Sequence, residues 1–326
     1  MFTETRAGPA ASQAFVHEAL FYAGRRQFLE GTVPFLREGL ARGEPALVVV
    51  DASKIAALRE ELGSDASRVH FADMTHIGRN PARIIPRWRE FVDEHLRADR
   101  PVRGIGEPIW AGRHAAELVE CQAHETLLNL AFADSPAWSL LCPYDVAALE
   151  PSVVDEARRS HPFVAYDGTR RVSGEYLAAH PSPSRLDQPL SPPPASAEAL
   201  AFGPSCEALR AVRALVLQHA RRSGLDPVAT EHLTLAANEL ATNSLRHGGG
   251  TGTVRVWRDG DTLSCEVRDA GQIHGQPLLG RQRPAVEQIG GRGLWLANQL
   301  CDLVQIRSSP AGTAVRLQMR IGPDRL

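Results

Sequence analysis

Residues 239–248 read Glu239-Leu-Ala-Thr-Asn243-Ser-Leu-Arg-His247-Gly248, and this stretch decides how the second half of the chain is interpreted. Glu239 and Asn243 are four residues apart, so they lie on one face of a helix. Asn243 offers a neutral amide oxygen, a hard ligand that suits Mg²⁺ together with phosphate oxygens. Glu239 is placed to take a proton from a hydroxyl that attacks phosphorus. Taken alone, such a pair is most often a solvated helix face, so its meaning depends on the motifs nearer the C terminus.

Three glycine-containing features come later in the sequence. Asp269 ends a predicted strand, where its carboxylate can accept a hydrogen bond from an exocyclic amine, and Gly271 lets a flat ring approach the backbone. Gly291 and Gly293 introduce a helix, whose N terminus favours anions. This segment is not a GxxxxGK[ST] phosphate loop, because it lacks the lysine and follows a long loop. The last feature is a Gly-Thr pair that contains Thr313 and begins the final strand.

In this order and spacing, the four features resemble the nucleotide-binding boxes of the GHKL ATPase superfamily. Over residues 197–326 the chain looks most like the anti-sigma-factor kinases of that superfamily, whose box helix carries a Glu-x-x-x-Asn-x-x-x-His-Gly pattern. The resemblance implies an α+β two-layer sandwich (the Bergerat fold) that binds ATP and Mg²⁺. It implies that Glu239 is the general base and that Asn243 is the Mg²⁺ ligand. The implied nucleotide contacts are Asn243, His247, Asp269, Gly271, Gly291, Gly293 and Thr313.

Several details of this half stay open or depart from the family pattern. His247 either approaches the nucleotide or caps the last carbonyls of its helix. Thr313 is expected to support Asp269 near the adenine. The adenine box reads Asp-Ala-Gly-Gln-Ile, without the second glycine that is often present, so the hinge of the lid is expected to differ. In the lid, residues 272–288, Arg281 and Arg283 either meet a γ-phosphate or are solvated loop charges.

The first half alternates between strand and helix patterns. The run at 46–50 is short, β-branched and apolar, as expected of a strand buried on both faces. Strands separated by helices predict a mostly parallel sheet covered on both faces. The predicted strands are 46–50, 69–71, 102–105 and 139–142, and the predicted helices are 27–41, 55–62, 83–96 and 117–131.

Motifs across residues 12–180 resemble the MEDS sensory domain. They are His17…Tyr22, the turn at 39–45, Arg103-Gly-Ile-Gly-Glu-Pro108, Glu125-Thr-Leu-Leu-Asn129, Leu141-Cys-Pro-Tyr-Asp145 and His161-Pro162. The resemblance implies a RecA-like α/β sheet that has lost its phosphate loop. The sequence agrees, because Asp51-Ala-Ser-Lys54 follows the first buried strand without a glycine-rich cradle. We therefore expect no ATP hydrolysis in this half.

Glu107 is the best candidate for a ligand contact in the first half. It lies just past a predicted strand, and α/β sheets bind ligands outside the carboxyl ends of their strands. His17, Tyr144, Asp145 and His161 are weaker candidates, and for each of them the simpler interpretation is a satisfied polar residue. Two histidines and a carboxylate can make a metal site, but nothing in the sequence shows that they converge.

The second half has a different order of elements, and a linker precedes it. Proline and serine are dense over 181–196, which predicts a semi-rigid spacer between domains at 1–180 and 197–326. The elements after the linker do not strictly alternate, so we expect helices on one face of a mixed sheet. The predicted helices are 206–223, 227–247 and 293–301, and the predicted strands are 253–258, 263–269, 303–308 and 314–319.

Composition excludes several classes of protein. The 326 residues carry 36 basic and 38 acidic side chains, a formal charge of −2, so no basic field favours nucleic acid or an anionic membrane. No apolar run approaches the roughly 20 residues that span a bilayer. No secretory signal is expected, because the N terminus carries Glu4 and Arg6 with no apolar stretch behind them. No disulfide or zinc framework is expected either, because the five cysteines are scattered without CxxC spacing and are interpreted as buried reduced thiols. The sequence predicts a cytoplasmic protein of two domains.

The sequence leaves three functions open. The first is a regulatory kinase that phosphorylates serine or threonine on an antagonist protein and can also sequester a sigma factor, with the first domain sensing an unknown small-molecule or protein signal. The second is a pure binding module with a nucleotide-gated or vestigial pocket. The third and weakest is a histidine kinase, because His219 has no acidic neighbour in sequence and its segment fits the first helix of the ATPase domain. A homodimer is expected only by analogy.

Overall fold

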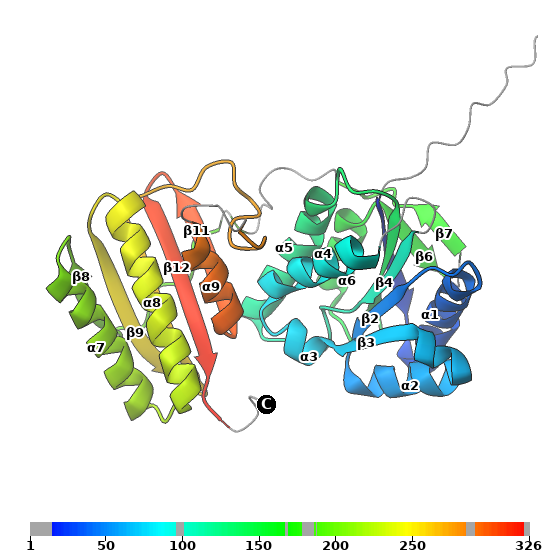
Figure 1. The fold of residues 1–326 in the computed structure, drawn as a ribbon, viewed down its shortest axis with the longest axis horizontal. Helices are drawn as coiled ribbons and strands as arrows, with labels where there is room; N and C mark the ends of the chain where they lie inside the picture. Colours follow the sequence, from blue (N-terminus) through cyan, green and yellow to red (C-terminus); the bar gives the residue numbers. More distant parts are fainter. Residues whose placement is uncertain are drawn as a thin grey trace, which may run out of the picture. The chain divides into compact units, whose positions relative to one another are not determined.

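The computed structural model describes residues 15–95, 101–166, 169–177, 186, 188–284 and 291–322 (Figure 1). The chain divides into two compact units, each drawn from several segments. The first comprises Met1–Asp73, Phe91–Trp110 and Asn129–Ala178, and the second comprises Met74–Glu90, Ala111–Leu128 and Ala179–Leu326. Two helices, α4 (Ile84–His95) and α5 (Ala115–Ala131), begin in the second unit and end in the first.

The first unit is built on a seven-stranded sheet. Its strands are β1 (Phe15–Tyr22), β2 (Ala46–Val50), β3 (Val69–Asp73), β4 (Val102–Gly106), β5 (Trp138–Asp145), β6 (Phe163–Tyr166) and β7 (Thr169–Val172). They lie in the order β3-β2-β4-β5-β1-β6-β7. Neighbouring strands are parallel, except that β7 pairs with β6 in the antiparallel sense. The predicted α/β class with a mostly parallel sheet is confirmed.

Apolar side chains of α1 (Gly24–Ala41) and α2 (Ala52–Leu62) form a core with the strands of this sheet. Every residue of β2 is buried, as expected of a central parallel strand. Helix α2 starts directly after β2, because the Asp51 side chain accepts hydrogen bonds from the backbone N–H groups of Ser53 and Lys54. The segment after β2 is therefore a capped helix start with no glycine-rich loop. The unit also contains η1 (Gly63–Arg68) and α6 (Pro151–Ser160).

Strand β1 was not among the predicted strands, although it lies inside the sheet between β5 and β6. Its polar residues interrupt the apolar run that marks a buried strand. In the structure these side chains have distant partners: His17 Nδ1 lies 3.0 Å from Asn129 Oδ1, and Arg170 Nε donates to Glu18 at 2.6 Å. Because the partners are 112 and 152 residues away, no local pattern could show that the polar residues of β1 are satisfied.

The second unit contains a five-stranded sheet in the order β11-β12-β10-β9-β8. Its strands are β8 (Glu198–Phe202), β9 (Gly252–Asp259), β10 (Thr262–Asp269), β11 (Leu303–Ser309) and β12 (Gly312–Arg320). All of the pairs are antiparallel, so the expectation of a mixed sheet was wrong. The edge strand β8 was not predicted, because it is short and most of its residues are exposed, with Phe202 buried and Leu200 half-buried.

Helices α7 (Cys206–Arg222), α8 (Pro227–His247) and α9 (Arg292–Leu300) cover one face of this sheet (Figure 1). Small residues of α8, among them Ala236, Ala237 and Ala241, are fully buried and let the helix lie close to the strands. Asp226 caps the start of α8 by accepting from the N–H groups of Val228 and Ala229. The α+β two-layer sandwich is therefore confirmed.

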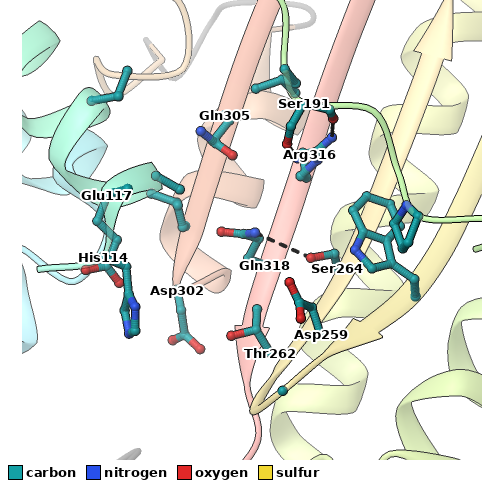
Figure 2. Close-up of a pocket in the computed structure, with 18 of the residues that line it drawn as sticks. His114, Glu117, Ser191, Asp259, Thr262, Ser264, Asp302, Gln305, Arg316 and Gln318 are labelled. Atoms are coloured by element: carbon teal, nitrogen blue, oxygen red, sulfur yellow. Dashed lines mark hydrogen bonds between the residues drawn. The ribbon is translucent and has the colours of Figure 1, made fainter.

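The opposite face of the same sheet is polar. Glu266 is fully buried there between Arg268 and Arg316, with 2.6 Å between Arg316 Nη2 and Glu266 Oε2. Part of the proline-rich segment lies along this face, because Arg316 Nη2 donates to the carbonyl of Ser191 at 2.5 Å. A cavity of about 1050 Å³ opens beside these residues (Figure 2). None of the predicted nucleotide contacts lines it, and Arg316 and Gln318 in its wall are hydrogen-bonded to protein groups.

Short segments from the first half of the sequence complete the second unit. They include α3 (Met74–Ile77) and η2 (Pro81–Arg83). Arg83 donates to the carbonyls of Asn298 and Cys301 and so satisfies the C-terminal end of α9. Four of the five cysteines are buried, and Cys206 is exposed, contrary to the expectation that all are buried. Over the described residues, no helix is both long and apolar enough to cross a membrane.

Candidate functional site

A cavity of about 350 Å³ lies in the second unit between α8, α9 and the ends of β10 and β12. Its lining includes six residues from the predicted nucleotide set: Asn243, His247, Asp269, Gly271, Gly291 and Thr313. The remaining wall is largely apolar and includes Leu240, Val267, Ile273, Leu279, Leu294 and Val315. A concave apolar site with a few convergent polar groups is typical of a small-molecule pocket. Glu239 and Gly293 do not line this cavity.

Asp269 is the last residue of β10, and two donors hold its carboxylate. Ser244 Oγ donates to Oδ2 at 2.6 Å, and the backbone N–H of Gly271 donates to Oδ1 at 2.8 Å. The two hydrogen bonds hold the carboxylate in one orientation. The side chain is therefore a fixed carboxylate at the wall of the cavity, and each oxygen keeps a lone pair for a ligand donor. Ser244 was not predicted, although it directly follows Asn243 and is buried in α8.

Thr313 lies opposite Asp269 in the register of β10 and β12. Its hydroxyl donates to the carbonyl of Gly271 at 2.8 Å and lies 2.9 Å from Ser308 Oγ. Ser308 in turn accepts from the backbone N–H of Ile273 at 2.8 Å. The side chain of Thr313 therefore fixes the loop after Asp269, rather than the Asp269 carboxylate itself. Ser308 is a second residue of this network that was not predicted.

Two glycines allow the end of α8 to meet the end of β10. A Cβ atom on Gly248 would lie 2.3 Å from Cγ of Asp269. A Cβ atom on Gly271 would lie 2.6 Å from the carbonyl oxygen of His247 and 2.8 Å from Cα of Gly248. Any larger residue at either position would push the helix end away from the carboxylate. The His247 side chain is exposed at the last turn of α8 and lines the cavity.

Glu239 and Asn243 meet the start of α9. A Cβ atom on Gly293 would lie 2.9 Å from Asn243 Nδ2 and 3.2 Å from Glu239 Oε2, so the first turn of α9 packs against both side chains. Gly291 precedes that turn with a φ of 76°, a left-handed conformation that favours glycine. The Asn243 amide, the Glu239 carboxylate and the N terminus of α9 thus lie together, and Asn243 also lines the cavity.

One of the two lid arginines, Arg281, differs from expectation. Arg281 is buried, and its Nη2 lies 3.1 Å from Oε2 of Glu120, so it is neither a phosphate contact nor a solvated charge. Glu120 also pairs with Arg307 at 2.9 Å. The partner of Arg281 is 161 residues away in sequence, which is why the loop pattern could not reveal it. Arg283 is exposed, and residues 285–288 of the lid lie outside the described residues.

His219 lies on α7, which packs against α8 and the sheet, as expected of the first helix of an ATPase domain. Its Nε2 lies 2.8 Å from Oε2 of Glu198 in β8. The acidic neighbour that the sequence lacked is thus supplied by a strand. The imidazole pairs with the sheet edge of its own domain, and this arrangement gives no support to a phosphoacceptor histidine.

Glu107 is placed at the carboxyl ends of the first unit's strands, directly after β4. It is 3% exposed, and two side chains bind its carboxylate: Tyr22 donates to Oε1 at 2.6 Å, and Lys54 Nζ lies 2.7 Å from Oε2. Burial raises the pKa of Glu107 to about 7, against the opposing effect of Lys54. Burial opposes protonation of Lys54, but Glu107 and Asp51 raise its pKa overall. Tyr22 and Lys54 were not predicted.

Replacing Glu107 by Gln should remove a pH dependence of stability. Between its unfolded value near 4.5 and its folded value of about 7, the native carboxyl binds more protons than the unfolded one, so stability falls as pH rises through this window. We expect the free energy of unfolding of the wild type, relative to Glu107→Gln, to fall by about 3 kcal/mol between pH 5 and pH 8. Denaturant unfolding of the full-length wild type and Glu107→Gln, at a series of pH values from 5 to 8, measures this difference in the free energy of unfolding. The exposed Glu60→Gln is the control, and parallel profiles for wild type and Glu107→Gln would contradict the prediction.

The weaker candidates of the first unit lie in two places. His17 and His161 come together, with ring centroids 4.0 Å apart, and the ring of Tyr144 lies 5.6 Å from that of His161. Asp145 ends β5, and its Oδ1 accepts from the backbone N–H of Ala147 at 3.1 Å, which makes it a turn residue. Convergence of the two histidines is a feature that the sequence did not show.

Comparisons with known proteins separate the chain into two regions. Residues 16–162 match the family described as MEDS: MEthanogen/methylotroph, DcmR Sensory domain. Residues 202–319 match the family described as Histidine kinase-like ATPase domain. Both match the resemblances predicted from the motifs. Among solved structures, the chain is similar to the RsbU and RsbW domains of Rv1364c from Mycobacterium tuberculosis, with 21% identity and a TM-score of 0.30, covering 41% of this chain and 36% of that one. Among curated proteins, none matches significantly.

Proposed function

Since the chain carries a MEDS sensory domain and a histidine kinase-like ATPase domain, we propose that it is a signal-responsive anti-sigma regulatory kinase. In this proposal the ATPase domain binds Mg-ATP and phosphorylates a serine or threonine of an antagonist protein, which controls the availability of a sigma factor. The MEDS domain receives the signal. The observation that carries the proposal is the fixed carboxylate of Asp269 in a cavity that Asn243 also lines.

The cavity suits an adenine ring. The Asp269 carboxylate accepts from the exocyclic amine, while Ser244 and Gly271 hold it in place. The close approach of Gly271 to Gly248 leaves no space for a side chain on Gly271 beside the cavity. Apolar side chains such as Leu240 and Val315 remove the ring faces from water. The volume of about 350 Å³ is at the small end of ligand pockets, so it holds the base and the rest of the nucleotide extends outward.

The phosphates extend toward the start of α9. Asn243 would hold Mg²⁺ through its amide oxygen, and the ion would neutralise charge on the phosphate oxygens. The first turn of α9, at Gly293, supplies N–H donors and the positive end of the helix dipole. The hydroxyl oxygen of the antagonist's serine or threonine bonds to the γ-phosphorus, and Glu239 takes the proton of that hydroxyl. The bond between that phosphorus and the β–γ bridging oxygen breaks, and ADP leaves.

One observation favours a second function. The cavity does not reach Glu239, so the chain can bind a nucleotide base without the proposed general base facing the same space. In that case the domain acts as a nucleotide-gated binding module that sequesters its partner without transferring phosphate. Both functions require nucleotide binding at Asp269, and only the kinase requires Glu239.

Replacing Asn243 by Ala tests the Mg²⁺ part of the site. We expect calorimetric titration of the full chain to show micromolar ATP binding that strengthens at least tenfold with Mg²⁺, and we expect Asn243→Ala to lose that dependence. The control is Asn238→Ala, because Asn238 is an amide on the same helix whose Oδ1 accepts from Arg213 at 2.7 Å, away from the cavity. An unchanged Mg²⁺ dependence in Asn243→Ala would remove Asn243 from the site. A folded wild type that binds no ATP would refute nucleotide binding altogether.

A further inference from the structure

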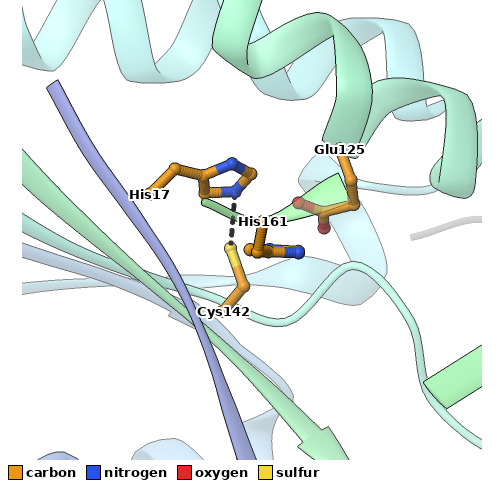
Figure 3. A group of neighbouring side chains, drawn as sticks. All are labelled: His17, Glu125, Cys142 and His161. Atoms are coloured by element: carbon orange, nitrogen blue, oxygen red, sulfur yellow. Dashed lines mark hydrogen bonds between the residues drawn. The ribbon is translucent and has the colours of Figure 1, made fainter. Parts of the chain in front are cut away.

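A cluster of buried ligand-type side chains lies in the MEDS region, well separated in sequence from the nucleotide site. It consists of His17, Glu125, Cys142 and His161, and Figure 3 shows their side chains pointing toward one another. One ligand atom from each residue lies within 4.8 Å of the others, and all four residues are buried.

The positions of the ligands follow from the fold. His17 and Ala19 share a face of β1, and Ala19 is the register partner of Cys142 in the neighbouring parallel strand β5. This pairing places Cys142 Sγ 3.4 Å from His17 Nε2. His161 follows the last turn of α6, and Glu125 lies one turn before Asn129 on α5. Neighbouring strands, the C-terminal end of α6 and an interior turn of α5 therefore hold the cluster in place.

Both imidazoles are oriented through Nδ1. His17 Nδ1 lies 3.0 Å from Asn129 Oδ1, and Asn129 Nδ2 donates to the carbonyl of Ser160 at 2.7 Å, which fixes the amide so that its oxygen faces the ring. His161 Nδ1 lies 2.8 Å from the carbonyl oxygen of Ala157. Each ring thus donates from Nδ1, and its Nε2 carries the lone pair. A histidine whose Nδ1–H is held by an oxygen is the usual arrangement of a metal ligand.

We propose that His17 Nε2, His161 Nε2, Cys142 Sγ and the Glu125 carboxylate bind one Zn²⁺ ion. Zinc bonds of about 2.0 to 2.3 Å in a tetrahedron set ligand-to-ligand distances of about 3.3 to 3.8 Å. The 3.4 Å between Cys142 Sγ and His17 Nε2 is already in that range. The other distances between ligand atoms are at most 4.8 Å, so they need to shorten by no more than about 1 Å when the ion binds.

The charge and softness of the ligands select this ion. Cys142 as thiolate and Glu125 as carboxylate bring two negative charges, which a dication neutralises in a buried site. Thiolate and imidazole ligands favour Zn²⁺ over Mg²⁺ or Ca²⁺, which take oxygen ligands. Binding removes the proton from the Cys142 thiol and releases it to solvent, while the two neutral imidazoles release none. Four protein ligands and full burial are typical of a closed structural site.

The test uses the full chain, purified without chelator and then exchanged with Co²⁺ as a spectroscopic probe. We expect about one zinc per chain by metal analysis and, after exchange, visible bands of tetrahedral Co²⁺ together with a thiolate-to-cobalt charge-transfer band. We also expect release of about one proton per ion bound. Cys142→Ser should lose the charge-transfer band, while Cys121→Ser should keep it, because Cys121 is an equally buried cysteine outside the cluster.

Other outcomes of the same experiment overturn the proposal. A wild type that holds no zinc and gives no tetrahedral Co²⁺ spectrum would leave the cluster as a buried polar contact. A charge-transfer band that survives in Cys142→Ser and disappears on replacement of the exposed Cys206 would show adventitious surface binding. Metal analysis and Co²⁺ spectra of the wild type alone decide whether the cluster binds a metal ion. A variant that fails to fold therefore does not prevent the test. ATP affinity, measured in parallel, tests the nucleotide site independently.

Discussion

Replacing Asp269 by Asn is expected to weaken ATP binding by about 100-fold, which corresponds to about 2.8 kcal/mol. The wild-type carboxylate receives donors on both oxygens, from Ser244 and from Gly271. Asparagine has a single acceptor oxygen, and the Gly271 N–H cannot turn away from it. The amide NH₂ then faces Ser244, whose hydroxyl rotates to accept, so the fold survives. The substitution removes the second acceptor oxygen, Oδ2. An adenine amine directed at the place of Oδ2 then meets the NH₂ group of asparagine, which is itself a donor.

Calorimetry with two nucleotides separates this effect from general damage. Inosine triphosphate carries a carbonyl where adenine carries its amine, so the wild type should prefer ATP strongly and Asp269→Asn should discriminate little between them. The control is Asp226→Asn, which removes a carboxylate from the N-cap of α8, where asparagine caps equally well. ATP affinity within threefold of wild type in Asp269→Asn would exclude the carboxylate as the adenine acceptor.

The helices and strands around the site were predictable, because their patterns are local. Helix α8 begins with an Asp-Pro cap and carries an apolar stripe, and the sequence of β10 alternates between apolar and polar residues. The sequence predicted Asp269 at a turn, because the apolar pattern of the strand ends there and Gly271 follows. The packing of the end of α8 against the end of β10 depends on Gly248 and Gly271, whose close contacts are visible only when both elements are present.

The parts that were not predicted depend on partners far away in sequence. Ser244 is one of many serines until Asp269 is seen to lie 2.6 Å from it. Strand β1 looks too polar for a sheet interior until Asn129 and Arg170 are seen to satisfy its polar side chains. Arg281 looks like a loop charge until Glu120 is seen beside it. In each case a buried polar residue has a partner far away in sequence, and no periodic pattern encodes such a pair.

The largest expected effect on catalysis is that of Glu239→Gln. Glutamine keeps the size of the side chain, so the contact with the first turn of α9 at Gly293 is preserved. It cannot accept the hydroxyl proton, and general-base catalysis is usually worth a factor of about 10² to 10⁴ in rate. We therefore expect the rate at which ATP loses its γ-phosphate, summed over transfer to protein and transfer to water, to fall by a factor of about 10² to 10⁴. ATP affinity should stay within threefold of wild type, because the cavity that holds the base does not include Glu239.

The matched control is Glu231→Gln, which makes the same change at an exposed position two turns earlier on α8. It should leave both rate and affinity unchanged, so that any effect at position 239 is local to the start of α9. If Glu239→Gln transferred phosphate at the full rate, Glu239 would not be the base. If the wild type bound ATP tightly and neither protein consumed it, the nucleotide would act as a conformational ligand. Rate and affinity measured on the same proteins thus separate a kinase from a nucleotide-gated binding module.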